Sequence, residues 1–166
     1  MLNRLIVILS ISLFIFTSCE KKTEEDLTGM PVVTMETILT DYEIIWGMDF
    51  IPNGDLIFGE KRGKLYRKSN ETVTEITGFP QVLSAGQGGL LDIRVHPDYE
   101  DNSWIYACYA ASNPAGGSQL KLIRFSITND QVQNVENIFT TSGSNTWYGH
   151  YGSRIVFDNA NYLYLS

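Results

Sequence analysis

The sequence has too little of several residue types to belong to some large protein classes. Its 166 residues include only two cysteines, too few for a disulfide scaffold. Lysine and arginine number 12 against 19 aspartates and glutamates, so the net charge of −7 offers no positive surface to nucleic acid. The same charge opposes electrostatic binding to anionic lipid headgroups. The longest apolar run, Leu5–Phe16, is shorter than the about 20 residues that span a bilayer.

The composition favours strands and turns instead. Hydrophobic residues make up 43% of the chain, which suits a folded globular protein. Fourteen glycines, nine tyrosines and eight phenylalanines favour β-structure with many turns. No long helical pattern separates the strand-like segments, which disfavours α/β folds. We therefore predict an all-β protein.

The first residues have the pattern of an export signal. Arg4 supplies a positive charge, an apolar core follows, and the small residues Thr17 and Ser18 precede Cys19. This arrangement resembles a bacterial lipobox, which implies cleavage before Cys19 and lipidation of that residue. An ordinary secreted protein with a stray cysteine is the alternative. We predict a signal peptide at 1–18, a lipidated and flexible tether at 19–30, and a folded part at 31–166, anchored to a bacterial membrane and facing the periplasm or the cell surface.

The second cysteine, Cys108, has a different setting. It lies in the strand-like run from Trp104 to Ala110. A nucleophilic cysteine needs an electropositive and accessible environment, which this run does not supply. We expect Cys108 to be a small buried hydrophobe.

The folded part repeats a four-stranded unit. The first unit has predicted strands at 45–51, 56–60, 64–68 and 72–77, with Asn53-Gly54 as a hairpin turn. The second has strands at 90–95, 104–110, 120–128 and 132–139, and a third begins with 154–157 and 162–166. Aligning the first strands places Phe50, Val95 and Phe157 in register, at spacings of 45 and 62 residues. Such periods indicate a β-propeller, of which this chain would hold about two and a half N-terminal blades.

Two glycine-flanked motifs lie just before first strands. Gln87 stands in Gly86-Gln87-Gly88-Gly89, and His150 in Gly149-His150-Tyr151-Gly152. Glycines let a ligand or another backbone approach closely. Because equivalent strands begin on the same face of a propeller, we expect Gln87 and His150 on one rim, on neighbouring blades.

Four motifs in order resemble the glucose/sorbosone dehydrogenase family, the quinoprotein sugar dehydrogenases. They are WGMDFIPNG from Trp46, GEKRGKL from Gly59, GQGGLLDIRVHPDY from Gly86 and GHYGSRIVFD from Gly149, and the resemblance extends from Trp46 to Ser166. It implies a six-bladed β-propeller that uses pyrroloquinoline quinone (PQQ) and calcium to oxidise aldose sugars to lactones. A quinone or a cytochrome would then accept the electrons.

The resemblance also implies roles for individual residues. His150 matches the general base, and a histidine can accept a proton at neutral pH. Gln87 matches a glutamine that contacts the quinone and the sugar. Arg154 would either support the anionic cofactor or fill the channel lining. Gly149 departs from relatives that carry an aspartate before the base, which leaves the sugar specificity open.

Other residues have simpler interpretations. His96, in His96-Pro97-Asp98, is predicted to be a turn residue. Asp92 and Asp98 are isolated carboxylates and weak evidence for a calcium site. Trp46 is expected in the core.

The whole-protein function therefore has three candidates. The leading one is the PQQ- and calcium-dependent aldose dehydrogenase, whose calcium ligands and most cationic PQQ contacts would lie beyond residue 166. For that reason we expect the 166-residue chain alone to be inactive. The alternatives are a calcium-dependent lactonase-like propeller hydrolase and a non-catalytic propeller that binds carbohydrate or protein, because fold alone does not separate these functions.

Overall fold

The structure, a computed structural model, describes residues 31 and 33–166. The predicted signal peptide at 1–18, Cys19 and the tether at 19–30 lie outside the described residues. Residues 33–38 are exposed and carry no helix or strand, and a compact unit runs from Leu39 to Ser166. In the described part of the chain, no helix is both long and apolar enough to cross a membrane.

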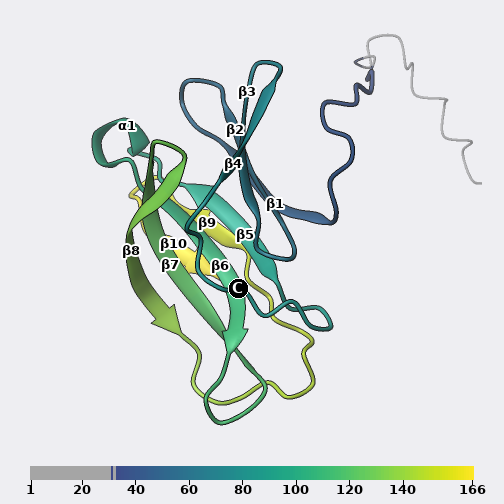
Figure 1. The fold of residues 1–166 in the computed structure, drawn as a ribbon. Coiled ribbons are helices and arrows are strands. Elements are labelled where there is room, and N and C mark those ends of the chain that lie inside the picture. The colour runs from purple at the N-terminus through teal and green to yellow at the C-terminus, as the bar shows by residue number, and fades with distance from the viewer. Residues whose placement is uncertain (1–30, 32) are drawn as a thin grey trace, which may run out of the picture. The chain divides into compact units, whose positions relative to one another are not determined.

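The first predicted unit is an antiparallel sheet in chain order (Figure 1). Its strands are β1 (Ile45–Phe50), β2 (Leu56–Glu60), β3 (Leu65–Ser69) and β4 (Thr72–Ile76). In the turn between β1 and β2, only Gly54 has a positive φ, of 91°. Asn53 contributes its side chain instead, since its Oδ1 accepts the Asp55 N–H at 3.0 Å. The predicted hairpin is confirmed, with one residue rather than two in the left-handed region.

The second unit has the same strand order. Its strands are β5 (Leu90–Val95), β6 (Ile105–Ser112), β7 (Ser118–Thr128) and β8 (Gln131–Thr140). A single helical turn, α1 (Tyr99–Asn102), follows β5 and was not predicted. It extends the His96 turn, in which Nδ1 of His96 accepts the Asp98 N–H at 3.0 Å. His96 is therefore a turn residue, as predicted.

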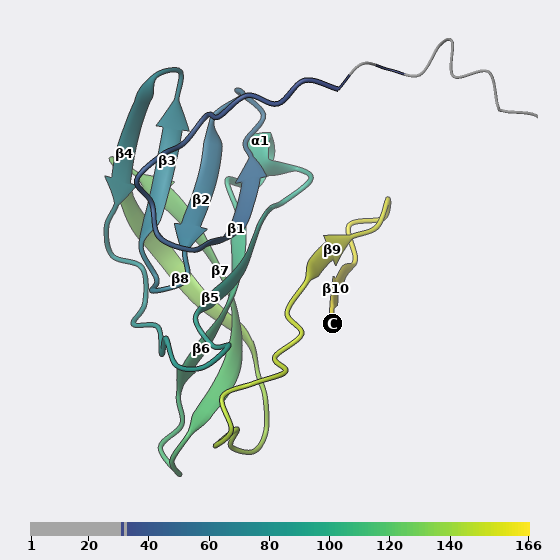
Figure 2. The same ribbon diagram turned by 90° about the vertical axis from the view of Figure 1, so that its right-hand side faces the viewer.

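The third unit begins with a strand pair. β9 (Ile155–Phe157) and β10 (Leu163–Leu165) are antiparallel, and Figure 2 shows the pair beside β5. Phe50, Val95 and Phe157 are each the last residue of a first strand. The predicted register of the three units is confirmed.

Alternation along β6 explains how the units pack. Ile105, Ala107 and Tyr109 join the core shared with the first sheet. The intervening Tyr106 and Cys108 join a second core, which also contains Ile155 from β9. The two faces of β6 therefore bury different units, so nearly the whole strand is apolar.

Cys108 is fully buried in that second core. Burial, and to a smaller extent the charge of Asp92, raises the pKa of its thiol to about 12. The thiol is therefore protonated at neutral pH and cannot act as a nucleophile. The structure confirms the prediction of a buried hydrophobe.

This burial predicts how the thiol reacts. We expect Cys108 to resist a disulfide reagent at pH 8 in the folded protein and to react within minutes in denaturant, because unfolding exposes the thiol and returns its pKa to the ordinary range of about 8.5. The measurement uses the protein from its complete gene in a Cys19→Ser background, so that Cys108 is the thiol followed within this chain. Full reaction without denaturant would show that β6 is not packed as described.

Candidate active site

The Gln87 loop sits directly against the His150 loop. The Gln87 N–H donates to the Tyr148 carbonyl at 2.7 Å. Gly86 has a φ of +56°, and a Cβ there would lie 2.5 Å from the same carbonyl oxygen. A side chain at Gly86 would therefore force the two loops apart. The glycine is needed both for its conformation and for this close approach.

Asn145 holds the His150 loop in its conformation. Its Oδ1 accepts the N–H groups of Trp147 and Tyr148 at 3.1 and 2.9 Å. Its Nδ2 donates to the Gly149 carbonyl at 2.8 Å. Tyr148 and His150 both have positive φ values, 58° and 54°, which non-glycine residues rarely adopt. One amide side chain therefore stabilises a backbone path that has an intrinsic conformational cost.

The structure brings together the two residues that the repeat placed on one rim. The His150 N–H donates to Oε1 of Gln87 at 2.8 Å. This bond uses the His150 backbone, so both ring nitrogens remain for a substrate. It also fixes the Gln87 amide with its Nε2 as the end still able to donate. The ring of Trp147, which is 73% exposed, lies 4.9 Å from the His150 ring.

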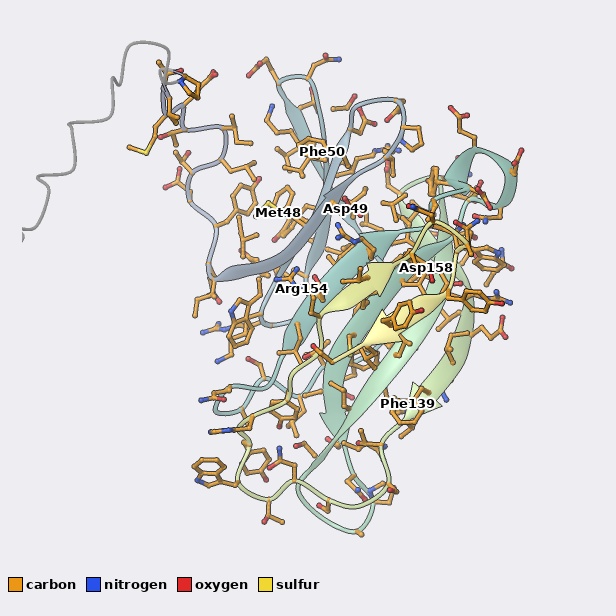
Figure 3. The ribbon with its side chains drawn as sticks, turned by 180° about the vertical axis from the view of Figure 1, so that it is seen from behind. Met48, Asp49, Phe50, Phe139, Arg154 and Asp158 are labelled. Atoms are coloured by element: carbon orange, nitrogen blue, oxygen red, sulfur yellow. The ribbon has the colours of Figure 1, made fainter. Side chains whose placement is uncertain are left out.

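A buried carboxylate holds the side chain of Arg154. Its Nη1 lies 3.1 Å from Oδ1 of Asp92, whose Oδ2 accepts the Ile155 N–H at 2.7 Å. Burial raises the pKa of the Asp92 carboxyl, and the Ile155 N–H and Arg154 oppose that shift. The Arg154 side chain stays 67% exposed (Figure 3). Asp92 thus anchors one end of the guanidinium and leaves the rest to face a ligand.

Several of the residues described above line one pocket of about 330 Å³. Gln87, His150, Tyr151 and Arg154 contribute polar groups, and Trp46 contributes an aromatic wall. Trp46 is 39% exposed, so the prediction that it belongs to the core is wrong. It lies on β1 beside Lys61, whose Nζ is 5.2 Å from the indole centroid. The indole lies on the exposed face of β1, where it lines the pocket instead of being buried in the core.

A second cleft of about 460 Å³ shares His150 and Tyr151 with the pocket. Its other polar lining comes from hydroxyl and amide side chains on β7 and on the segment after β8. The Tyr151 hydroxyl lies 2.5 Å from the buried Ser118 Oγ, and this hydrogen bond fixes the Tyr151 side chain in the lining of the cleft. His150 therefore borders both spaces.

Three contributors to the site were not predicted from the sequence. Trp147 and Asn145 precede the glycine-flanked motif, and Trp46 was assigned to the core. The spacing Asn145-x-Trp147-Tyr148 does carry a signal, because an asparagine two residues before an N–H favours an Asx turn. Among the described residues there is no group of three His, Cys, Asp or Glu side chains that could hold a metal ion.

Comparison with known proteins identifies the family to which the sequence is similar. The sequence profile of the Glucose / Sorbosone dehydrogenase family matches residues 42–166. Aldose sugar dehydrogenase YliI of Escherichia coli (strain K12) is 26% identical over 139 residues, which cover 81% of this chain and 38% of that protein. Uncharacterized protein slr1608 of Synechocystis is 24% identical over 139 residues, 78% of this chain and 34% of that protein.

Solved structures give the same picture. The apo form of the soluble aldose sugar dehydrogenase from Escherichia coli matches with a TM-score of 0.69 and 25% identity, over 75% of this chain and 37% of that one. The PQQ-bound aldose sugar dehydrogenase from Streptomyces coelicolor matches with a TM-score of 0.63 and 26% identity, over 79% of this chain and 40% of that one. The fold is part of a β-propeller, as predicted, and the chain spans about two fifths of the length of these relatives.

The buried Asp92 gives a stability prediction for the protein from its complete gene. Asp92→Ala should lower the free energy of unfolding by about 1–3 kcal/mol, because the Ile155 N–H loses its acceptor in a buried position. Asp92→Asn should cost less, since its amide oxygen can accept that N–H and burial already disfavours the charged form. Denaturant titration measures both.

The matched control removes an exposed carboxylate. Glu136→Ala breaks the surface pair with Arg124, which should change the free energy of unfolding by no more than about 1 kcal/mol. An Asp92→Ala protein as stable as the Glu136→Ala protein would contradict a structural role for the Asp92 carboxylate.

Proposed function

Because the chain belongs to the glucose/sorbosone dehydrogenase family, we propose that the whole protein oxidises aldose sugars at the anomeric carbon to lactones, with PQQ as cofactor. The observation that carries the proposal is one pocket that holds the His150 ring, the Gln87 amide and the Arg154 guanidinium. A base, a neutral hydrogen-bonding group and a cation are the three functions that this reaction needs beside an anionic redox cofactor.

In this proposal His150 acts as the general base. Its ring is exposed at the wall between the pocket and the cleft, where a sugar hydroxyl can reach it. The anomeric hydroxyl loses its proton to the ring, and the anomeric carbon loses a hydride. The C=O bond of a lactone remains, so atoms and electrons balance. Gln87 and Asn145 fix the His150 backbone, which keeps the ring positioned for that transfer.

The pocket fits one edge of PQQ, a planar group with three carboxylates. The Trp46 indole offers a flat apolar surface, and the exposed nitrogens of Arg154 match a carboxylate in charge and in geometry. The Gln87 Nε2 adds a neutral donor, because Oε1 is already used by the His150 N–H. Bound there, PQQ would supply the hydride acceptor.

Calcium belongs to the same proposal on the family resemblance. The described residues supply no cluster of carboxylates or histidines for it, so no step here is assigned to it. The remaining partners are an electron acceptor, which would be a quinone or a cytochrome, and a membrane reached through lipid on Cys19. The negative charge of the chain makes a covalent anchor the consistent mode of attachment.

The two histidines of the chain give a matched test of the base. In the protein from its complete gene, supplied with PQQ, calcium, an aldose and an artificial acceptor, His150→Gln should lower kcat about 100-fold or more, because glutamine cannot accept the proton. His96→Gln should retain kcat within about twofold, since His96 lies in a turn and lines neither the pocket nor the cleft.

The outcomes separate the candidate functions. Quinone-dependent turnover that depends on His150 supports the dehydrogenase. Sugar-lactone hydrolysis without a quinone would contradict the proposal and favour the hydrolase. A folded protein that binds sugar with neither activity would contradict it and favour the non-catalytic propeller.

Removal of calcium is a separate prediction. Dialysis of the active holoenzyme against a chelator should abolish sugar oxidation, and added Ca²⁺ should restore it, because the family resemblance implies that the active protein needs calcium. Magnesium is the control ion, since its stricter octahedral geometry suits few protein calcium sites. Full activity after complete removal of calcium would exclude calcium from the proposal.

A further inference from the structure

Trp46 occupies an irregular position in its strand. The register between β1 and β2 shifts between Ile45 and Gly47, so Trp46 has no partner residue on β2. An extra residue of this kind bends its strand and redirects its side chain, and such bulges are frequent beside active sites. Here the redirected indole forms a wall of the pocket. It also lacks the cross-strand neighbour that normally packs against a strand side chain.

The second unit repeats this bulge with a different support. The register between β5 and β6 shifts between Leu90 and Asp92, which leaves Leu91 without a partner on β6. Leu91 lies 45 residues after Trp46, at the spacing of the two units, and it lines the same pocket. Leu91 packs against the core around Cys108, whereas Trp46 belongs to none of the cores found in the described residues. The indole therefore needs a contact from outside the cores to hold it.

Lys61, in the turn between β2 and β3, supplies that contact. Its Nζ lies 5.2 Å from the centroid of the Trp46 ring, within the about 6 Å over which a cation is attracted to an aromatic face. The same ammonium donates a hydrogen bond to the Gly86 carbonyl at 2.6 Å. Gly86 precedes Gln87, so the ammonium links the aromatic wall to the loop that carries the Gln87 amide.

The Lys61 backbone is fixed on both sides. Its N–H donates to the Ile44 carbonyl, and its own carbonyl accepts the Leu90 N–H, each at 2.8 Å. A Cβ on Gly89 would overlap the Lys61 carbonyl oxygen and would lie 2.6 Å from the Lys61 Cγ. The lysine stem therefore packs closely against the start of β5, and the half-buried side chain has less conformational freedom to lose in holding its ammonium in place.

We propose that Lys61 is a positioning residue of the site: anchored by the Gly86 carbonyl, its ammonium holds the Trp46 indole in the pocket wall and so preorganises that wall for a planar anionic cofactor. The inference rests on the proposed function, which supplies PQQ as the ligand of the pocket. Lys61 is not one of the residues that line the pocket, so it acts through the indole. An indole that is already ordered adds to affinity, because the ligand does not have to order it.

The test measures PQQ binding by the apoprotein and needs no turnover. In the protein from its complete gene, with calcium present, Lys61→Met keeps the length of the side chain and removes its charge. It should weaken PQQ binding about tenfold in a calorimetric titration. Lys61→Arg should stay within about threefold of the wild-type protein, because a guanidinium can also donate to a carbonyl and lie on an aromatic ring.

The matched control removes a positive charge from the same turn. Lys64 is exposed and pairs with Glu75, and neither residue lines the pocket. Lys64→Met should therefore bind PQQ as the wild-type protein does. Equal losses of affinity in Lys61→Met and Lys64→Met would overturn the inference, because net charge alone would then account for the effect. Unchanged affinity in Lys61→Met would also overturn it.

A double-mutant cycle shows whether Lys61 acts through the indole. In a Trp46→Leu background, Lys61→Met should change the PQQ affinity less than about threefold, because the side chain that Lys61 positions is absent. A tenfold loss in both backgrounds would overturn the positioning role and would indicate a direct effect of the charge on the ligand.

Failure of this inference is distinguishable from failure of the proposed function. A wild-type protein that binds PQQ but oxidises no sugar would overturn the dehydrogenase, and a tenfold weaker binding by Lys61→Met would still support the role of Lys61. Sugar oxidation together with unchanged PQQ affinity in Lys61→Met would overturn the inference alone. A wild-type protein that does not bind PQQ would overturn both.

Discussion

The first strands of the second and third units, β5 and β9, each depend on a carboxylate from the unit before them. The first strand of a unit pairs with its own sheet on one side only, which leaves backbone N–H groups on the other side without a strand partner. Oδ2 of Asp49 accepts the Val95 N–H at 2.9 Å, and Oδ2 of Asp92 accepts the Ile155 N–H at 2.7 Å. These side chains complete the hydrogen bonding of β5 and β9 and hold successive units side by side.

The same lateral contact assembles the site. A Cβ on Gly47 would lie 2.8 Å from the Ile93 nitrogen, so β1 and β5 approach as closely as their backbones allow. The Gln87 and His150 loops precede β5 and β9, the strands that Asp92 links, and these two loops also meet. Asp92 adds a second consequence, because the carboxylate that binds the Ile155 N–H also holds Arg154 at the pocket. One buried carboxylate therefore both links β5 to β9 and holds the cation at the pocket.

How much the sequence could predict depends on how many residues each sequence pattern spans. Two-residue alternation and turn residues specify the ten strands, and alignment of first strands is enough to place Gln87 near His150. The helix α1 is too short to produce a periodic pattern. Asn145 acts through side-chain bonds to the backbone, which hydropathy does not encode. A strand has two faces, and the sequence does not say which of them stays exposed. The apolar Trp46 was therefore wrongly placed in the core.

The two spaces that meet at His150 differ in charge. The Arg154 side provides a cation and an aromatic wall, while the cleft side provides hydroxyls and amides and, among the described residues, no charged side chain. An anionic ligand would lose water in the cleft without gaining a cation, so the cleft disfavours it. A neutral polyhydroxylated ligand would gain hydrogen bonds in the cleft and would not have to displace the ion pair between Arg154 and Asp92. His150 therefore lies at the boundary between two spaces that favour different ligand chemistry.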